Sequence, residues 1–402
     1  INENENFFWE LASYFKGFFL KNKNLKYIIF YNVPHLPWEL TLFYTAKLLN
    51  IKTLILRKTS IGGVSYISED FRRFKKEHKF TYENNDLNIF GNESDKIKKI
   101  NILKNTEFAK GQLDGIWPEI YKIRNKFWNV YTPTIAYYLS IIYYLIKPIN
   151  PQTLGAKEKI NLNSNFSRQR NISRFDFFQL LYNYKKKLRK LVNIDNSYPK
   201  KLDKLENLKY IFFPLHYQPE ATTMPEGYYF SQQNMAIKLL SENIDDNIKI
   251  IVKDHPKQYY NDLRSYHYRD EEYLKKINEF KNVTVVSSKF DYSSLLNNAT
   301  LTATISGSVS WQSLLRGIPS LVFSDTWLTD CKSVKLIHEK ENIKKEINEL
   351  INFNKDEVLN HVINFIEENQ KYFLKTVIFS PHLRFFNYDN KIPLKNLQKH
   401  LL

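Results

Sequence analysis

Five short apolar segments alternate with helical patterns in the second half of this 402-residue chain, and this alternation constrains the fold most strongly. The intervals between the segments carry apolar residues at helical spacing. Parallel strands need such crossovers, since a tight turn joins only antiparallel strands. The alternation therefore predicts a doubly wound α/β domain with a parallel sheet. The predicted strands are Tyr210–Pro214, Ile248–Lys253, Val283–Ser287, Leu301–Ser306 and Ile318–Phe323, and the predicted helices lie near Gln232–Ser241, Glu271–Phe280, Tyr292–Asn297 and Val309–Arg316.

The first half contains a smaller unit of the same kind. An apolar run, Leu25–Asn32, is followed by a helical pattern, Trp38–Asn50, and by a second apolar run, Ile51–Arg57. Strand, helix and strand in this order predict a second parallel sheet. We therefore expect the α/β class, with two Rossmann-like domains whose parallel sheets are flanked by helices.

A polar stretch, Ser197–Leu205, separates the two units. Exposed polar segments that contain proline are typical of domain boundaries. From Ser333 on, the chain has a helical pattern and then an irregular tail. The expected parts are an N-terminal domain at residues 1–204, a C-terminal domain at 205–380, and a tail at 381–402 whose candidate packing surface is the N-terminal domain.

The chain has a formal net charge of +17, which favours anionic partners such as nucleic acid, anionic lipid or phosphorylated compounds. No zinc-finger spacing, RNA-binding signature or long basic tail accompanies this charge, so no nucleic-acid partner is expected. The basic segment Lys185–Lys190 is the candidate for peripheral contact with an anionic membrane, and the alternative is an ordinary solvated helix face.

The single cysteine, Cys331, excludes an internal disulfide and indicates a reducing compartment. The most apolar run, Thr134–Ile146, is too short to span a bilayer. We therefore expect a cytoplasmic protein, with a position at the inner face of the cytoplasmic membrane as the open alternative.

Polar clusters follow three of the predicted strands in the second half. The carboxyl ends of parallel strands form one edge of the sheet, and ligands of such sheets bind there. These clusters therefore predict a binding site. They comprise His216, Gln218 and Glu220 after the first strand, Lys253, His255 and Pro256 after the second, and Ser306, Gly307 and Ser308 after the fourth.

The segment SGSVSWQSLLRG, residues 306–317, is the sharpest local signal. A strand ends, a glycine permits close backbone approach, and a helix begins, so that free amides and the hydroxyls of Ser306, Ser308 and Ser310 form a candidate phosphate site. The alternative is that one serine only caps the helix. His255, at a strand end fixed by Pro256, is placed to hydrogen-bond a leaving phosphate. A nucleophile elbow, a Walker loop and a dinucleotide-binding glycine motif are all absent.

In these segments the chain resembles the capsule polysaccharide biosynthesis family of bacterial glycosyltransferases. The resemblance covers Tyr210–Trp327 and rests on FFPLHYQPEATTMPEG, IVKDHP and TISGSVSWQSLLRGIPSLVF in this order. The family carries a similar QPE loop, a Lys-Glu-His-Pro turn and a Gly-Ser/Thr-x-Gly-Trp-Glu-Ala-Leu helix start. The N-terminal half is similar only through NVPHLPWEL and the strand–helix–strand unit around it. The chain departs from the pattern at Asp254, Ser310 and Gln312, where Glu, Gly and Glu are common.

The resemblance implies a GT-B architecture, in which two Rossmann-like domains face each other across a cleft. The acceptor then lies mostly on the N-terminal domain and the nucleotide sugar on the C-terminal one. The implied reaction transfers an ulosonic acid such as Kdo, or a sialic-acid-like sugar, from a CMP-activated donor to a glycan or lipid-linked acceptor of a capsule or lipopolysaccharide. The alternatives are a UDP-sugar or polyol-phosphate donor, or a non-catalytic role in capsule assembly.

The resemblance also assigns the donor-side residues. As in related bacterial sialyltransferases, His255, Ser306 and Ser308 would contact the CMP phosphate, and no metal ion or other cofactor is expected. The other expected donor-side residues are His216, Gln218, Lys253, Pro256 and Gly307.

Two carboxylates compete for the role of base or nucleophile, which sugar transfer to a hydroxyl requires. Glu39, near His35, follows the first strand of the N-terminal domain, and Glu220 follows the first strand of the C-terminal domain. Because the acceptor side is N-terminal, we expect Glu39 to be the base, with His35 beside it, and Glu220 to bind sugar or ribose. The alternative for Glu39 is a place in the first turn of a helix, where the helix dipole favours a carboxylate.

Overall fold

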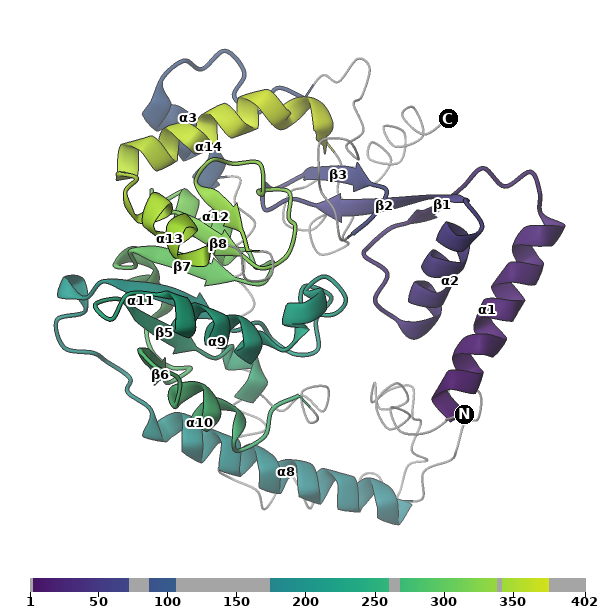
Figure 1. Ribbon diagram of the computed structural model, residues 1–402, viewed down its shortest axis with the longest axis horizontal. Coiled ribbons are helices and arrows are strands. Elements are labelled where there is room, and N and C mark those ends of the chain that lie inside the picture. Colours follow the sequence, from purple (N-terminus) through teal and green to yellow (C-terminus); the bar gives the residue numbers. More distant parts are fainter. Residues whose placement is uncertain (1–2, 72–86, 106–173, 260–267, 338–341, 376–402) are drawn as a thin grey trace.

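The computed structural model describes residues 3–71, 87–105, 174–259, 268–337 and 342–375 (Figure 1). Within these ranges the strands form one sheet of four strands and one of six. The apolar run at 134–146 and the tail at 381–402 lie outside the described residues. In the part of the chain that the structure describes, none of the helices combines the length and apolarity that a membrane span requires.

The larger sheet is parallel throughout, with the order β6-β5-β4-β7-β8-β9. From β4 the chain builds outward on one side to β6, and then crosses to β7 on the other side of β4. This reversal makes the carboxyl ends of β4 and β7 the topological switch point, where doubly wound sheets bind their ligands. The strands are β4 (Tyr210–Pro214), β5 (Lys249–Lys253), β6 (Val283–Val286), β7 (Leu301–Thr304), β8 (Ser320–Val322) and β9 (Val334–Leu336).

The helices of this half lie between the strands as the sequence predicts. They are α9 (Gln233–Asn243), α10 (Tyr273–Asn278), α11 (Tyr292–Asn297) and α12 (Val309–Leu314), followed by α13 (Ile343–Ile351) and α14 (Lys355–Asn369). One expectation is wrong, because the chain after Ser333 first forms β9, which pairs with β8. Strand β9 lies in the polar stretch CKSVKLIHEK, without the apolar run that marks the equally short β8.

The smaller sheet has the order β1-β2-β3-β10. Strands β1 and β2 are parallel and joined through helix α2, as predicted, but β3 pairs antiparallel with both β2 and β10. The expectation of a wholly parallel sheet is therefore wrong here, since residues 59–63 are too few for a crossover and form a hairpin. The elements are β1 (Tyr27–Phe30), α2 (Pro37–Leu48), β2 (Lys52–Lys58), β3 (Val64–Ser68) and β10 (Leu374–Lys375).

Two further helices frame the molecule. Helix α1 (Glu3–Lys21) packs against α2. Helix α8 (Arg174–Ser197) runs along the bottom of the view in Figure 1, below β6 and α10. Side chains of α8, including Leu188 and Val192, belong to the core beneath β4 and β5. The α/β class with two Rossmann-like units is confirmed. The boundary at residue 204 stays a prediction. Helix α8 precedes this boundary but packs against the larger sheet, and β10 follows it but pairs with β3 of the smaller sheet.

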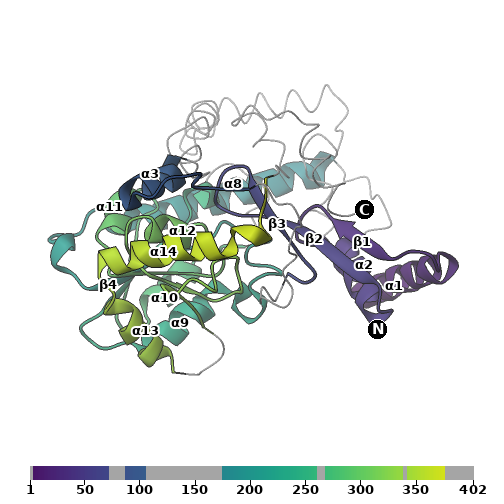
Figure 2. The ribbon, with the colours of Figure 1, turned by 90° about the horizontal axis from the view of Figure 1, so that it is seen from above.

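One of the hydrophobic clusters contains residues from both sheets. Figure 2 shows β2 and β3 reaching from the side of α1 and α2 to the larger sheet. Val64 and Tyr66 of β3 pack in the same cluster as Trp311 of α12 and Trp327 after β8. The ring of Trp327 lies 5.1 Å from that of Trp311 and 5.9 Å from that of Phe373, next to β10. Helix α3 (Lys96–Asn105) closes this core against α14.

We expect Trp327→Ala to lower the free energy of unfolding by about 3–5 kcal/mol, because the side chain is buried in the shared core. Urea denaturation followed by far-UV circular dichroism measures this change. Trp9→Ala is the control, since that ring is 69% exposed, and it should change stability by less than about 0.5 kcal/mol. A loss below about 1 kcal/mol from Trp327→Ala would contradict the shared core.

Candidate functional site

His216 connects the loops that follow β4 and β7 at the switch point. Its Nε2 lies 2.9 Å from the hydroxyl of Thr304, the last residue of β7, and its Nδ1 lies 3.1 Å from the hydroxyl of Thr222. The imidazole is almost fully buried, and burial, with the neighbouring charges of His255 and Arg269, lowers its pKa to about 3. His216 is therefore neutral at pH 7 and does not serve as an acid.

The hydrogen bonds through His216 run in one direction. The hydroxyl of Thr222 donates to Oε2 of Glu220 at 3.2 Å, so it accepts the proton of His216 Nδ1. Nε2 of the neutral ring then accepts from Thr304, whose oxygen in turn accepts the Gly307 N–H at 3.2 Å. The chain of donors thus begins at Gly307 and ends on the carboxylate of Glu220.

Gly307 makes this arrangement possible because no side chain fits there. A Cβ at position 307 would lie 2.7 Å from Thr304 Oγ1 and 3.0 Å from His216 Cε1. Both distances are too short for the bonded network to remain in place. The close backbone approach expected of this glycine is therefore toward His216 and Thr304.

The three serines around Gly307 have different surroundings. Ser306 donates to the carbonyl of Thr222 at 2.8 Å or to Oε2 of Glu226 at 3.0 Å, and Ser310 donates to the carbonyl of Gly307. Ser308 precedes α12 with its side chain exposed. The contact of Ser306 with a phosphate stays a prediction, but its hydroxyl is directed into the protein.

A buried ion pair links the loops after β4 and β5. Asp254 accepts from Nε and Nη2 of Arg269, each at 3.2 Å, and from the backbone N–H of His255 at 2.8 Å. Arg269 also donates to the carbonyl of His216 at 3.3 Å. Burial opposes the charge of Arg269, but Asp254 raises its pKa above the usual value. Asp254 is thus the anchor between His216 and His255.

His255 presents a proton on Nε2. The backbone N–H of Lys257 donates to Nδ1 at 3.1 Å, which leaves the proton of the neutral ring on the other nitrogen. Burial lowers the pKa of His255 to about 4, against the opposing effect of Asp254. The ring lies 5.9 Å from that of Tyr217, over which the ammonium of Lys257 sits at 4.4 Å. Pro256 opens the short turn that fixes this geometry.

Two of the expected donor-side residues have partners inside the protein. Lys253 is buried and donates to the carbonyl of Ser288 at 2.7 Å, and burial lowers its pKa to about 8. The backbone N–H of Gln218 donates to Gln258, and its side-chain amide donates to Thr223. Their contacts with a ligand stay predictions.

Glu220 is exposed at the end of the hydrogen-bond chain. Desolvation by the surrounding protein raises its pKa, while the charges of Lys257 and Lys58 act in the opposite direction. Lys58 ends β2, so the smaller sheet contributes a charge beside this carboxylate. A raised pKa makes a carboxylate a stronger proton acceptor.

Glu39 and His35 lie at the start of α2. Oε2 of Glu39 accepts the backbone N–H groups of Leu36 and His35, each at 3.0 Å, so this carboxylate caps the start of α2. The imidazole of His35 lies 2.8 Å from the carbonyl of Val33. The contacts of Glu39 therefore match the helix-start alternative, and its role as a base stays a prediction.

Arg57 and Glu226 are the residues that the sequence reasoning missed. Nη2 of Arg57, on β2, lies 3.1 Å from Oε1 of Glu226, and both side chains are buried. Burial opposes the charge, but Tyr66, Glu226 and Asp325 raise the pKa of Arg57. The available signal was an arginine at the end of a strand of buried residues, since a buried cation needs an anionic partner.

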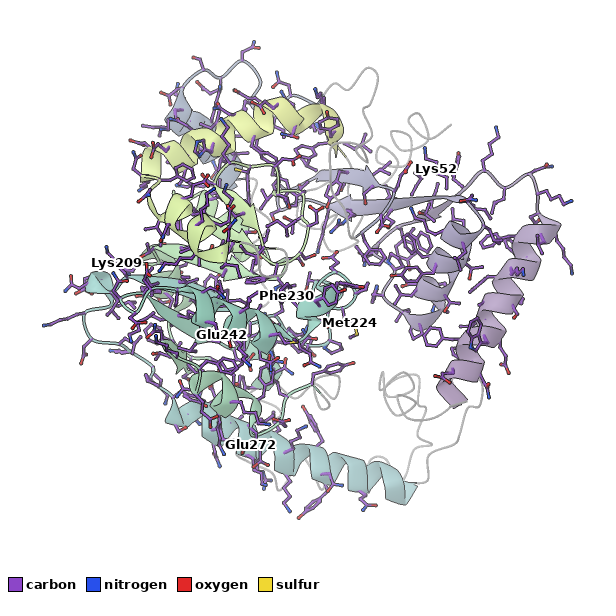
Figure 3. The ribbon with its side chains drawn as sticks, in the orientation of Figure 1. Lys52, Lys209, Met224, Phe230, Glu242 and Glu272 are labelled. Atoms are coloured by element: carbon purple, nitrogen blue, oxygen red, sulfur yellow. The ribbon has the colours of Figure 1, made fainter. Side chains whose placement is uncertain are left out.

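Glu226 joins this ion pair to the site. Its Oε2 accepts from Ser306, and its carbonyl accepts from Ser324 after β8 at 2.7 Å. Figure 3 shows Met224 and Phe230, which flank Glu226 in the chain, on the segment between the larger sheet and the side of α2. Among the residues that the structure describes, no group of three His, Cys, Asp or Glu is arranged to hold a metal ion.

Comparisons with known proteins concern the fold alone. No family model and no curated protein matches the chain. One similar solved structure is the β-Kdo 2,7 transferase KpsC of Thermosulfurimonas dismutans, which is 15% identical to this chain. The match covers 46% of this chain and 62% of that chain, with a TM-score of 0.27. The KpsC β-Kdo 2,4 transferase of the same organism has 11% identity, 84% and 86% coverage, and a TM-score of 0.30. The UDP-GlcNAc 2-epimerase of Methanocaldococcus jannaschii has 13% identity, 92% and 82% coverage, and a TM-score of 0.26.

The chain thus spans less than two thirds of the length of the first of these structures. At such TM-scores the similarities carry no argument about substrate or activity.

The low pKa of His216 predicts a loss of stability in mild acid. The folded-state value of about 3 lies below the usual 6.5, so the unfolded chain binds the proton first. The stabilisation is complete above pH 6.5 and is lost as the pH falls from 6.5 toward 3. His216→Asn keeps a donor at the Nδ1 position but does not titrate.

Urea denaturation at pH 7 and pH 5 tests this prediction. We expect the wild type to lose more stability between the two pH values than His216→Asn does. Equal losses in both proteins would show that His216 does not titrate in this way.

Proposed function

We propose that this protein is a glycosyltransferase of bacterial surface polysaccharide assembly, which transfers an ulosonic or sialic-acid-like sugar from a CMP-activated donor to a glycan acceptor. The observation that carries the proposal is the convergence of three separate motifs at the switch point. The QPE loop and the serine–glycine loop meet through His216 and Thr304, and the His-Pro turn joins them through Asp254 and Arg269. Nucleotides bind doubly wound sheets at this edge.

The proposed role of His255 is to stabilise the departing phosphate. Its Nε2–H is a fixed donor on a neutral ring, and Lys257 adds a positive charge two residues away. The exposed hydroxyl of Ser308 is the second proposed donor. Donors held in place before the reaction offset the charge that develops on the leaving group, and in this scheme no metal ion is needed.

The proposed base or nucleophile is Glu220 rather than Glu39. Thr222 donates a hydrogen bond to one oxygen of Glu220, and the raised pKa makes this carboxylate a stronger base. Glu39 instead uses a carboxylate oxygen to hold the first turn of α2. Glu39 and His35 remain on the side where the acceptor is expected. These contacts support proposing Glu220 for the role that the sequence suggests for Glu39.

We expect CMP to raise the melting temperature of the protein in EDTA, because a ligand that binds only the folded state stabilises it. UMP and UDP at the same concentrations should have smaller effects. His255→Ala should lose most of the CMP effect, and the control His35→Ala should keep it. Stabilisation by UDP without stabilisation by CMP would replace the donor assignment with a UDP-sugar.

Glu220→Gln should lower kcat by about 100-fold or more, because the amide cannot accept a proton. The assay measures CMP released from CMP-Kdo or CMP-sialic acid in the presence of acceptor glycan. CMP should still raise the melting temperature of the variant. This result would show that donor binding is intact and that the substitution affects the chemical step.

Glu39→Gln is the matched control for this substitution. Its side-chain oxygen can still accept the N–H groups of Leu36 and His35, so the variant should remain folded and keep kcat within a few-fold of the wild type. An inactive Glu39→Gln protein together with an active Glu220→Gln protein would return the role of base to Glu39.

A further inference from the structure

Exposed large apolar side chains are concentrated near the N-terminal end of the described chain. More than half of those in the described ranges lie between residues 8 and 48, on α1, α2 and the edge strand β1. Apolar surface gathered in one region of a protein marks a contact with another molecule or a membrane.

The most compact part of this surface is the end of α1 and the turn that follows it, Phe18–Lys26, which we name the α1 tip. Phe18, Leu20 and Leu25 are 45%, 55% and 36% exposed. The backbone and side-chain N–H groups of Asn22 both donate to the carbonyl of Phe18, at 3.1 and 2.7 Å. The N–H of Leu25 donates to the carbonyl of Asn22 at 3.0 Å, so the turn is fixed with these side chains outward.

The α1 tip is also basic. Lys21, Lys23 and Lys26 are all exposed, and no acidic residue occurs between positions 11 and 38. The acidic residues of α1 all lie within its first half. Figures 1 and 2 both show the tip at the outer end of the molecule, on the side away from the larger sheet. It is thus a projecting, positively charged apolar turn.

We infer that the α1 tip docks onto an anionic phospholipid bilayer. Leucine and phenylalanine side chains insert among the lipid headgroups, while flanking lysines extend their ammonium groups to the anionic ones. A second copy of the chain fits less well, because a symmetric contact would bring the same lysines together. A protein partner also fits less well, since lysine is depleted from the cores of protein interfaces.

This surface differs from the one that the sequence suggests, Lys185–Lys190 on α8. There, Lys190 pairs with Glu271 at 2.8 Å, and Lys187 is half-buried. Helix α8 also packs its apolar side against the core of the larger sheet. The α1 tip combines three exposed lysines with three exposed apolar side chains, whereas Tyr182 is the exposed large apolar side chain recorded for the described part of α8.

Sedimentation of the full chain with phosphatidylcholine vesicles, with and without phosphatidylserine, tests the inference. We expect binding only with phosphatidylserine. Lys21→Gln, Lys23→Gln and Lys26→Gln together should lower the partition coefficient about 100-fold. The control combines Lys186→Gln, Lys200→Gln and Lys201→Gln, which remove the same charge from exposed positions elsewhere and should change binding less than about threefold.

A second variant separates insertion from charge. Leu20→Ser with Leu25→Ser leaves the net charge unchanged and should lower binding about tenfold, because less apolar surface enters the bilayer. Equal losses from the two lysine triples, or no loss from the leucine variant, would overturn the inference. A concentration-dependent dimer that the leucine variant abolishes would assign the tip to a second copy. The assay contains no nucleotide sugar, so its outcome is independent of the proposed transferase activity.

Discussion

The buried ion pair between Arg57 and Glu226 is the contact on which the arrangement of the site depends. Neither charge is tolerated in the interior alone, so the segment around Glu226 takes its place only when β2 is present beside it. Glu226 in turn accepts hydrogen bonds from the hydroxyl of Ser306, which follows β7, through its carboxylate, and from the hydroxyl of Ser324, which follows β8, through its backbone carbonyl. The loops of the larger sheet are therefore arranged around a cation that the smaller sheet supplies.

Much of the larger sheet could be predicted from the sequence, because its strands are long enough to show apolar runs and its crossovers show helical spacing. Strands β9 and β10, with three and two residues, carry no such signal. The antiparallel strand β3 was missed for another reason. The signal for its hairpin was present as the dipeptide Gly62-Gly63 but was interpreted only as a loop. These two residues form the turn, in which the N–H of Val64 donates to the carbonyl of Ile61 at 3.2 Å, and the hydroxyl of Thr59 donates to the carbonyl of Val64.

The positions of the site residues could be predicted, but not the direction of their side chains. Gly307 and His255 lie at strand ends as expected. Ser306 and Lys253 also lie at strand ends, yet their polar atoms bond to Glu226 and to the carbonyl of Ser288. Those partners are distant in the sequence, so no local pattern reveals that the hydroxyl and the ammonium already have acceptors. Glu39 shows the reverse case, in which the backbone N–H groups of His35 and Leu36, close in the sequence, account for one oxygen of the carboxylate.

The shared core between the two sheets bears on how such a chain can change during evolution. Val64 and Tyr66 of the hairpin fill space beside Trp311 and Trp327, and β10 returns from the far end of the chain to pair with β3. Recombination at the linker near residue 204 would therefore separate side chains that fill one another's cavities, and a half grafted from a relative would have to match this packing. New substrate preferences are more accessible through substitutions in the loops at the strand ends than through exchange of whole halves.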